Sequence, residues 1–202
     1  MMKFLGGCLV FVLLLAALAF YWTTTWPEEV RRSIEIEAPA AAVFETVATP
    51  KTWPEWTAWT QERDPEAVWT FEGPDSGTGA SWEWRGLPLS EDGLGHGKLT
   101  LLETAPAERI EYGLVFWEDE TEWASTGAFL FEEHAGVTTV HWTMEPSGVE
   151  GLARGFTNFM MDMSVGPDFE TGLSQLKQRL ETDARSPAET PAEPAETPAA
   201  ND

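Results

Sequence analysis

Apolar and polar residues alternate in short runs through the middle of the chain, which is the pattern of half-buried β-strands. The first run, 32–38, places Ile34 and Ile36 on one face and ends near Pro39. A short helix with an apolar stripe is predicted directly after it, over 40–48. Six further runs follow at hairpin spacing, which predicts an antiparallel meander. They cover 67–72, 80–85, 97–103, 109–117, 122–132 and 137–144.

The period changes to that of a helix near the end of the patterned region. Four large apolar residues form one stripe, and four more continue it towards residue 180. They are Phe156, Phe159, Met160 and Met163, then Phe169, Leu173, Leu176 and Leu180. Gly166-Pro167 lies between the two sets and is predicted to kink or break the helix. We expect this helix to lie across the concave face of the sheet, which makes the fold class α+β.

The N-terminal region has a different pattern, an uninterrupted apolar run over 4–22 that is long enough to span a bilayer as a helix. Tyr21, Trp22 and Trp26 suit the aromatic belt of a membrane interface. The alternative is a removed signal peptide cleaved near residues 17–19, whose small residues resemble a cleavage site. We favour the anchor, because the run is long and its end is aromatic.

Positive charges flank this run almost equally, with Lys3 before it and Arg31 and Arg32 after it. A very short N-terminal tail before an apolar run is the usual form of an export signal. We therefore expect a single-pass membrane protein with its domain on the extracytoplasmic side.

The other end, 186–202, is rich in proline, alanine and glutamate and has no large apolar residue. Such a segment cannot offset its ordering entropy, so it is predicted to be disordered. The chain thus divides into an anchor over 1–27, a folded domain over 28–185 and a tail over 186–202.

Composition narrows the function classes. The 202 residues carry a formal net charge of −22, which repels phosphate backbones and makes nucleic acid an improbable partner. The single cysteine, Cys8, cannot form an intramolecular disulfide. The three histidines, His96, His134 and His141, lack the spacing of a zinc site. We expect neither a metal nor a cofactor.

Several short motifs recur in order across the folded domain. They are 34–44, Trp53 to Trp56 with Trp59, Asp64-Pro65, 71–74, 77–80, Trp84 to Gly86, 95–97, 139–142 and 169–177. In this order they resemble the START/Bet v 1-like (SRPBCC) superfamily, in particular bacterial polyketide cyclase/dehydrase-like proteins. The resemblance implies a helix-grip fold, in which a seven-stranded antiparallel sheet wraps around a long C-terminal helix. It also implies a hydrophobic cavity between sheet and helix, but no single chemistry.

Strand alternation and the helix stripe select the side chains that we expect to line this cavity. The candidate ligand-binding residues are Trp56, Trp59, Trp82, Trp84, Tyr112, Phe116, Trp123, Phe129, Trp142, Phe156, Phe159, Met160 and Met163. A lining of aromatic rings and methionines suits an apolar ligand held by shape and dispersion. For any one of these side chains, ordinary core packing is the competing interpretation.

The cluster of Trp53, Trp56 and Trp59 has its own alternatives. With Pro54 in the first turn of a short helix, we expect Trp53 to pack inward and the other two to form a wall or lid of the cavity. The rival interpretation is an interfacial foot resting on the bilayer.

The leading functional hypothesis is a membrane-anchored binding domain for a small hydrophobic molecule, such as a lipid, an isoprenoid or a polyketide-like compound. One alternative is a cyclase or dehydratase that uses Tyr112 on the same cavity. The other is a non-catalytic envelope module that binds a protein. Glu83, Arg85 and His141 fall on the opposite sheet face, so we interpret them as surface residues.

Overall fold

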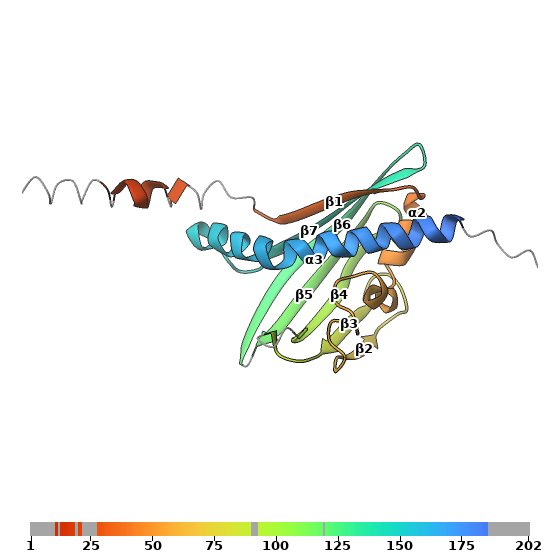
Figure 1. Ribbon diagram of the computed structural model, residues 1–202, viewed down its shortest axis with the longest axis horizontal. Helices are drawn as coiled ribbons and strands as arrows, with labels where there is room; N and C mark the ends of the chain where they lie inside the picture. The colour runs from red at the N-terminus through yellow and green to blue at the C-terminus, as the bar shows by residue number, and fades with distance from the viewer. Residues whose placement is uncertain are drawn as a thin grey trace, which may run out of the picture.

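The computed structural model describes residues 28–185 apart from 90–92 and 119, together with 11, 13–18, 20 and 21. In this part of the chain, seven strands form one antiparallel sheet in the order β1-β7-β6-β5-β4-β3-β2 (Figure 1). The strands are β1 Val30–Ile36, β2 Val68–Glu72, β3 Ser81–Arg85, β4 His96–Ala105, β5 Arg109–Glu118, β6 Thr121–His134 and β7 Val137–Pro146. Every predicted strand is confirmed, with ends shifted by at most two residues.

Two short helices separate β1 from β2. Helix α2, Ala40–Val47, begins after Pro39, which has the extended backbone of a residue that precedes a helix. The 3₁₀ helix η1, Pro50–Glu55, begins at Pro50, so Pro54 lies near its end and not in its first turn as predicted. Residues 56–67 continue from η1 to β2.

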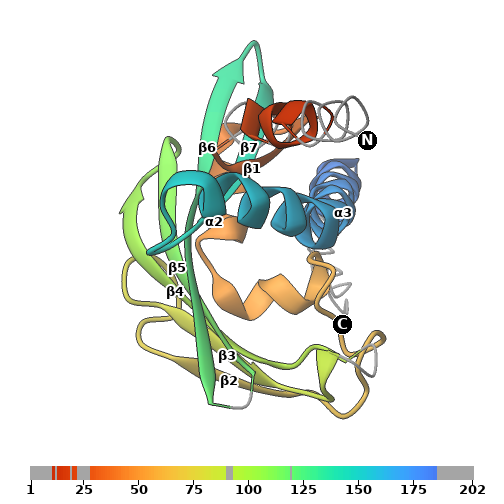
Figure 2. The same ribbon diagram turned by 90° about the vertical axis from the view of Figure 1, so that its left-hand side faces the viewer.

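The long helix α3, Gly151–Arg185, lies against the concave face of the curved sheet (Figures 1 and 2). This arrangement confirms the helix-grip architecture. The prediction at Gly166-Pro167 is a kink or a break. The helix is continuous through Pro167, so the break is absent within the described residues. Figure 2 shows the first part of α3 running across the view and the later part nearly end-on, so the helix bends. A proline inside a helix removes one backbone hydrogen bond and produces such a bend.

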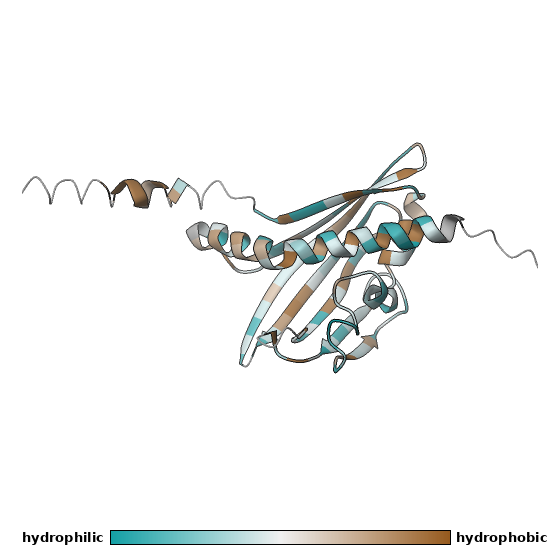
Figure 3. Cartoon of the chain, viewed as in Figure 1, coloured by the Kyte–Doolittle hydropathy of each residue, from teal (hydrophilic) through white to brown (hydrophobic). Residues whose placement is uncertain are grey.

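Alternation along the strands separates an apolar inner face from a polar outer face, visible as alternating brown and teal in Figure 3. The inner face carries an aromatic core in which Trp142 stacks on Phe169 of α3 with ring centroids 3.8 Å apart. Trp53 contacts Trp82, Phe129 and Trp142 edge to face at 5.6–6.2 Å. Such pairs stabilise a core beyond their area burial, by about 0.5–1.5 kcal/mol each.

Within the described residues, no helix combines the length and apolarity needed to cross a membrane. Residues 13–18 are helical. The rest of the apolar run over 4–22, and the whole tail over 186–202, lie outside the described residues.

Candidate ligand cavity between sheet and helix

A cavity of about 520 Å³ lies between the inner face of the sheet and the first half of α3. Its walls come from β5, β6, β7, the segment after β7, two loops and α3. The apolar lining residues are Trp59, Leu89, Leu114, Phe116, Trp123, Ala124, Met144, Pro146, Val149, Met161 and Val165. The polar lining residues are Arg63, Glu122, Ser125, Ser147, Thr157, Ser164 and Asp168.

Strand register explains why these side chains meet. Leu114 of β5 lies opposite Ser125 of β6, and Ser125 lies opposite Pro146 of β7. Residues directly opposite in an antiparallel pair share a face, so all three face α3. Phe116 and Trp123 form the next pair towards the β5–β6 turn. The cavity therefore occupies the end of the concave face nearest this turn.

A fixed loop forms the rim. Arg63 donates from Nη1 to both carboxylate oxygens of Asp168 in α3, at 3.0 and 3.2 Å. The neighbouring Asp64 is fully buried and accepts hydrogen bonds from the backbone N–H groups of Leu94 and Leu87 at 3.0 and 2.8 Å. These bonds, led by the one from Leu94, lower the pKa of Asp64.

Asp64 thereby connects two loops that meet at the cavity, because Leu89 on the rim belongs to the segment between its two backbone partners. Gly86 lies against the Asp64 carboxylate so closely that a Cβ there would collide with it. The motif residues Asp64 and Gly86 thus position the rim of the cavity and do not line the cavity themselves.

Three predicted site residues line the cavity: Trp59, Phe116 and Trp123. Trp59 is 6% exposed and stacks on Trp84 at 6.0 Å, so it forms the boundary between the cavity and the aromatic core. Trp123 is 58% exposed and lies at the outer edge of the cavity. Trp59 therefore lies in the cavity wall, and its contact with a ligand stays a prediction.

Six predicted site residues pack in the core instead, and their predicted place in the cavity wall is wrong. They are Trp56, Trp82, Trp84, Tyr112, Phe129 and Trp142, all at most 1% exposed. The physical reason is that their rings contact one another and fill the part of the concave face outside the cavity. The burial of Trp53, Trp56 and Trp59 also excludes an interfacial foot made by these indoles.

Tyr112 has its polar group satisfied inside this core. Its hydroxyl donates to the Thr143 carbonyl at 3.0 Å and accepts from Trp142 Nε1 at 2.9 Å. Burial raises the pKa of Tyr112, and the bond from Trp142 opposes this only in part. This geometry assigns Tyr112 a packing role.

The predicted inward face of the first half of α3 is also wrong. Phe156, Met160 and Met163 are 57%, 49% and 62% exposed and face away from the sheet, and Phe159 is half-buried but outside the lining. Instead Thr157, Met161, Ser164, Val165 and Asp168 line the cavity from α3.

The helical phase of these residues could have predicted which of them face the sheet. At about 100° per residue, Met163 and Phe169 differ by about 240° around the helix, so they cannot share a face. Counting back from the core residues Phe169 and Leu173 in steps of four gives Val165 and Met161, which do line the cavity.

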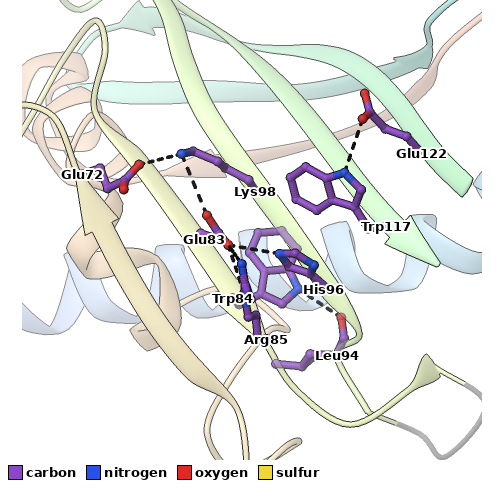
Figure 4. Close-up of polar contacts among 9 residues, drawn as sticks. All are labelled: Glu72, Glu83, Trp84, Arg85, Leu94, His96, Lys98, Trp117 and Glu122. Carbon is purple, nitrogen blue, oxygen red and sulfur yellow. Dashed lines mark hydrogen bonds and ion pairs between the residues drawn. The ribbon is translucent and has the colours of Figure 1, made fainter. Parts of the chain in front are cut away.

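The outer face of the sheet carries a separate polar cluster, drawn in Figure 4. Glu83 accepts hydrogen bonds from Arg85 Nη2 at 2.9 Å and contacts His96 Nε2 at 3.0 Å. These bonds, led by the one from Arg85, lower the pKa of Glu83. Trp84 points to the opposite side and donates to the Leu94 carbonyl. Glu83 and Arg85 therefore face away from the cavity, as the alternation predicts.

The fold and the cavity together define an α+β helix-grip domain with an apolar chamber under its long helix. The chain belongs to the family described as polyketide cyclase / dehydrase and lipid transport, whose model matches residues 27–181. No curated protein matches the chain.

Solved structures share the fold at low sequence identity. A protein from Chromobacterium violaceum is 16% identical with a TM-score of 0.54, aligning 77% of this chain with 98% of that one. A Mycobacterium smegmatis protein is 16% identical with a TM-score of 0.55, over 77% and 92% of the two chains. Aha1 from Colwellia psychrerythraea, solved as a dimer, is 18% identical with a TM-score of 0.52, over 76% and 96%. These similarities concern the fold alone.

Proposed function

We propose that this protein is a membrane-anchored binding domain for a small hydrophobic molecule held between the sheet and α3. The observation that carries the proposal is the cavity of about 520 Å³, whose walls include Trp59, Phe116, Met144 and Met161. Ligand pockets typically have volumes of about 300–1,000 Å³ and mostly apolar linings. Membership of a family described by lipid transport and cyclase activity supports the same class of ligand.

The lining also indicates the charge and polarity of the ligand. Its charged groups are Arg63, Glu122 and Asp168, and Arg63 is already paired with Asp168. An anionic head group would therefore meet carboxylates without a free cation among the lining residues. Three hydroxyl groups, on Ser125, Ser147 and Thr157, offer hydrogen bonds to a neutral polar end. The Ser164 hydroxyl already donates to the carbonyls of Met160 and Met161. An uncharged lipid, isoprenoid or polyketide-like compound with a hydroxyl or carbonyl group fits this lining.

The membrane anchor in this proposal is the apolar run over 4–22. The domain would then lie on the extracytoplasmic side of the bacterial cytoplasmic membrane, tethered near its ligand source. A C-terminal alkaline phosphatase fusion is expected to be active, because this enzyme requires export. Activity only of a cytoplasmic reporter at the same position would contradict the orientation.

The experiment for the cavity is to fill it. Ser125 faces the cavity, whereas its neighbour Thr126 is exposed on the outer face, so Ser125→Trp and Thr126→Trp form a matched pair. With the neutral dye Nile red as probe, Ser125→Trp is expected to weaken binding at least tenfold, whereas Thr126→Trp should leave it unchanged. A tenfold difference in affinity corresponds to about 1.4 kcal/mol of binding free energy. Equal binding by both variants, each with a wild-type melting profile, would overturn the proposal.

Gly127 is not a suitable position for this test. A Cβ there would collide with the Tyr112 hydroxyl and the Thr143 carbonyl, so a larger residue would disrupt the core before reaching the cavity.

A further inference from the structure

The first half of α3 has its apolar side on the outside. Phe156, Met160 and Met163 are all exposed and recur at intervals of four and three residues, so they form one outward stripe. Two further exposed residues beside this stripe, Ala153 and Pro167, are uncharged as well. The uncharged face over 153–167 is about 21 Å long at the rise of an α-helix.

This face is unusual for a chain with 34 acidic residues and a net charge of −22. Between 151 and 167 the sequence contains two charged residues, Arg154 and Asp162. Both are engaged with the strands: Arg154 Nη2 binds Glu145 at 2.6 Å, and Asp162 binds Arg32 Nη1 at 2.7 Å. The charges of this segment therefore face the sheet, whereas Phe156, Met160 and Met163 face outward.

The chain geometry indicates what covers the stripe. Arg154 Nη2 also reaches the carbonyl of Glu28 at 3.5 Å, so the polypeptide arrives at the domain beside the first turns of α3. The apolar run ends at Trp22, six residues before Glu28. Six extended residues span at most about 20 Å. If the run lies in a bilayer, the outward stripe is held within reach of that bilayer.

We propose that the outward stripe of Phe156, Met160 and Met163 lies on the lipid surface and embeds in the boundary between head groups and acyl chains. This inference rests on the membrane anchor of the proposed function. An uncharged apolar face inserts through its buried area, typically about 5–10 Å deep, without needing anionic lipid. The opposite side of the same turns carries Met161 and Val165, so one helix separates the lipid surface from the cavity.

The test places a fluorescent label on the stripe of the full-length chain. Cys8→Ser removes the single cysteine, and Met160→Cys then provides a unique site for an NBD fluorophore. Gln178→Cys is the matched control, because it is exposed on the later half of the same helix. Both variants are reconstituted in phosphatidylcholine vesicles and quenched with nitroxide-labelled lipid or with aqueous iodide.

We expect lipid quenching to exceed iodide quenching by at least about twofold at position 160 and to be reversed at position 178. The lipid quenching at position 160 should also be the same at low and high salt, because the contact is apolar. Vesicle flotation is measured on the same samples. If the chain does not float with the vesicles, the anchor is wrong and the proposed docking is overturned with it.

If the chain floats and position 160 remains accessible to iodide, the anchor holds and the docking inference is wrong. If neither quencher reaches position 160 and differently labelled chains show energy transfer between their position-160 dyes, a second copy covers the stripe, which also overturns the inference. Nile red binding to the same variants tests the proposed ligand cavity separately, so a failure of the docking inference is distinguishable from a failure of the proposed function.

Discussion

The two halves of α3 bury their inward side chains to different extents. In the later half, Phe169, Leu173 and Leu176 are at most 2% exposed and pack on the sheet, and polar residues such as Ser174 face outward. In the first half, Thr157, Met161 and Val165 are only half-buried and line a cavity, and Phe156 and Met160 face outward. The later half therefore packs into the core, whereas the first half separates the cavity from the outer surface of the domain.

The sheet beneath shows the same division. At the end nearest α2, Trp53, Trp142 and Phe129 fill the concave face with contacting rings. Towards the β5–β6 turn, the inner-face residues Leu114, Phe116 and Ser125 border the cavity. One fold therefore combines a rigid, packed end with a hollow end, and a ligand site requires both.

The largest predicted effect tests the packed end. Trp142→Ala removes a ring that stacks on Phe169 and donates to the Tyr112 hydroxyl. The free energy of unfolding should fall by about 3–5 kcal/mol, because a fully buried aromatic leaves a cavity. Urea denaturation followed by circular dichroism measures this change. A loss below about 1 kcal/mol would mean that the tryptophan core is loosely packed.

A smaller effect is expected at the rim of the cavity, where Asp64 connects two loops. Asp64→Asn places an amide where the carboxylate accepts from the backbone of Leu87 and Leu94, and should lower the free energy of unfolding by about 1–3 kcal/mol. Because folding lowers the pKa of Asp64, its contribution is complete above the unfolded value of about 3.9 and is lost as the pH falls through the folded value.

Acid titration of the wild type and of Asp64→Asn checks the direction of this pH dependence. The wild type should lose stability below about pH 4, and the difference between wild type and Asp64→Asn should shrink as the pH falls. A difference that grows on acidification would contradict the role given to this carboxylate.

The smallest effect is expected on the outward stripe. In detergent-free buffer, Met163→Ser should change the stability of the domain by less than about 0.5 kcal/mol, since the side chain is 62% exposed. Leu176→Ala on the same helix is the comparison, with an expected loss of about 2–5 kcal/mol. Thermal melts of the two variants would refute the division of α3 if their losses were equal.

Alternation and turn chemistry predicted nearly the whole sheet, because a strand with one buried face repeats every two residues whatever fills the core. The inner faces at Tyr112, Phe129 and Trp142 were also predictable. Which of these rings touch each other and which border a void depends on three-dimensional packing. A pattern of single residues does not contain that information.

Hydrophobicity alone misplaced the first half of α3, because Phe156, Met160 and Met163 are exposed while only Met161 and Val165 pack towards the core. Sequence reasoning assigned Phe156 and Met160 to the cavity on the assumption that apolar stripes are buried inward. Arg63 and Asp168 were missed for a related reason, since their pairing brings together residues more than 100 positions apart.

The most direct test of the central claim is native mass spectrometry of the detergent-extracted, full-length wild type beside Ser125→Trp, followed by organic extraction. The account predicts that one small apolar compound co-purifies with the wild type at near equimolar occupancy and is lost from Ser125→Trp. The same compound retained equally by both proteins would contradict the assignment of the cavity as the ligand site.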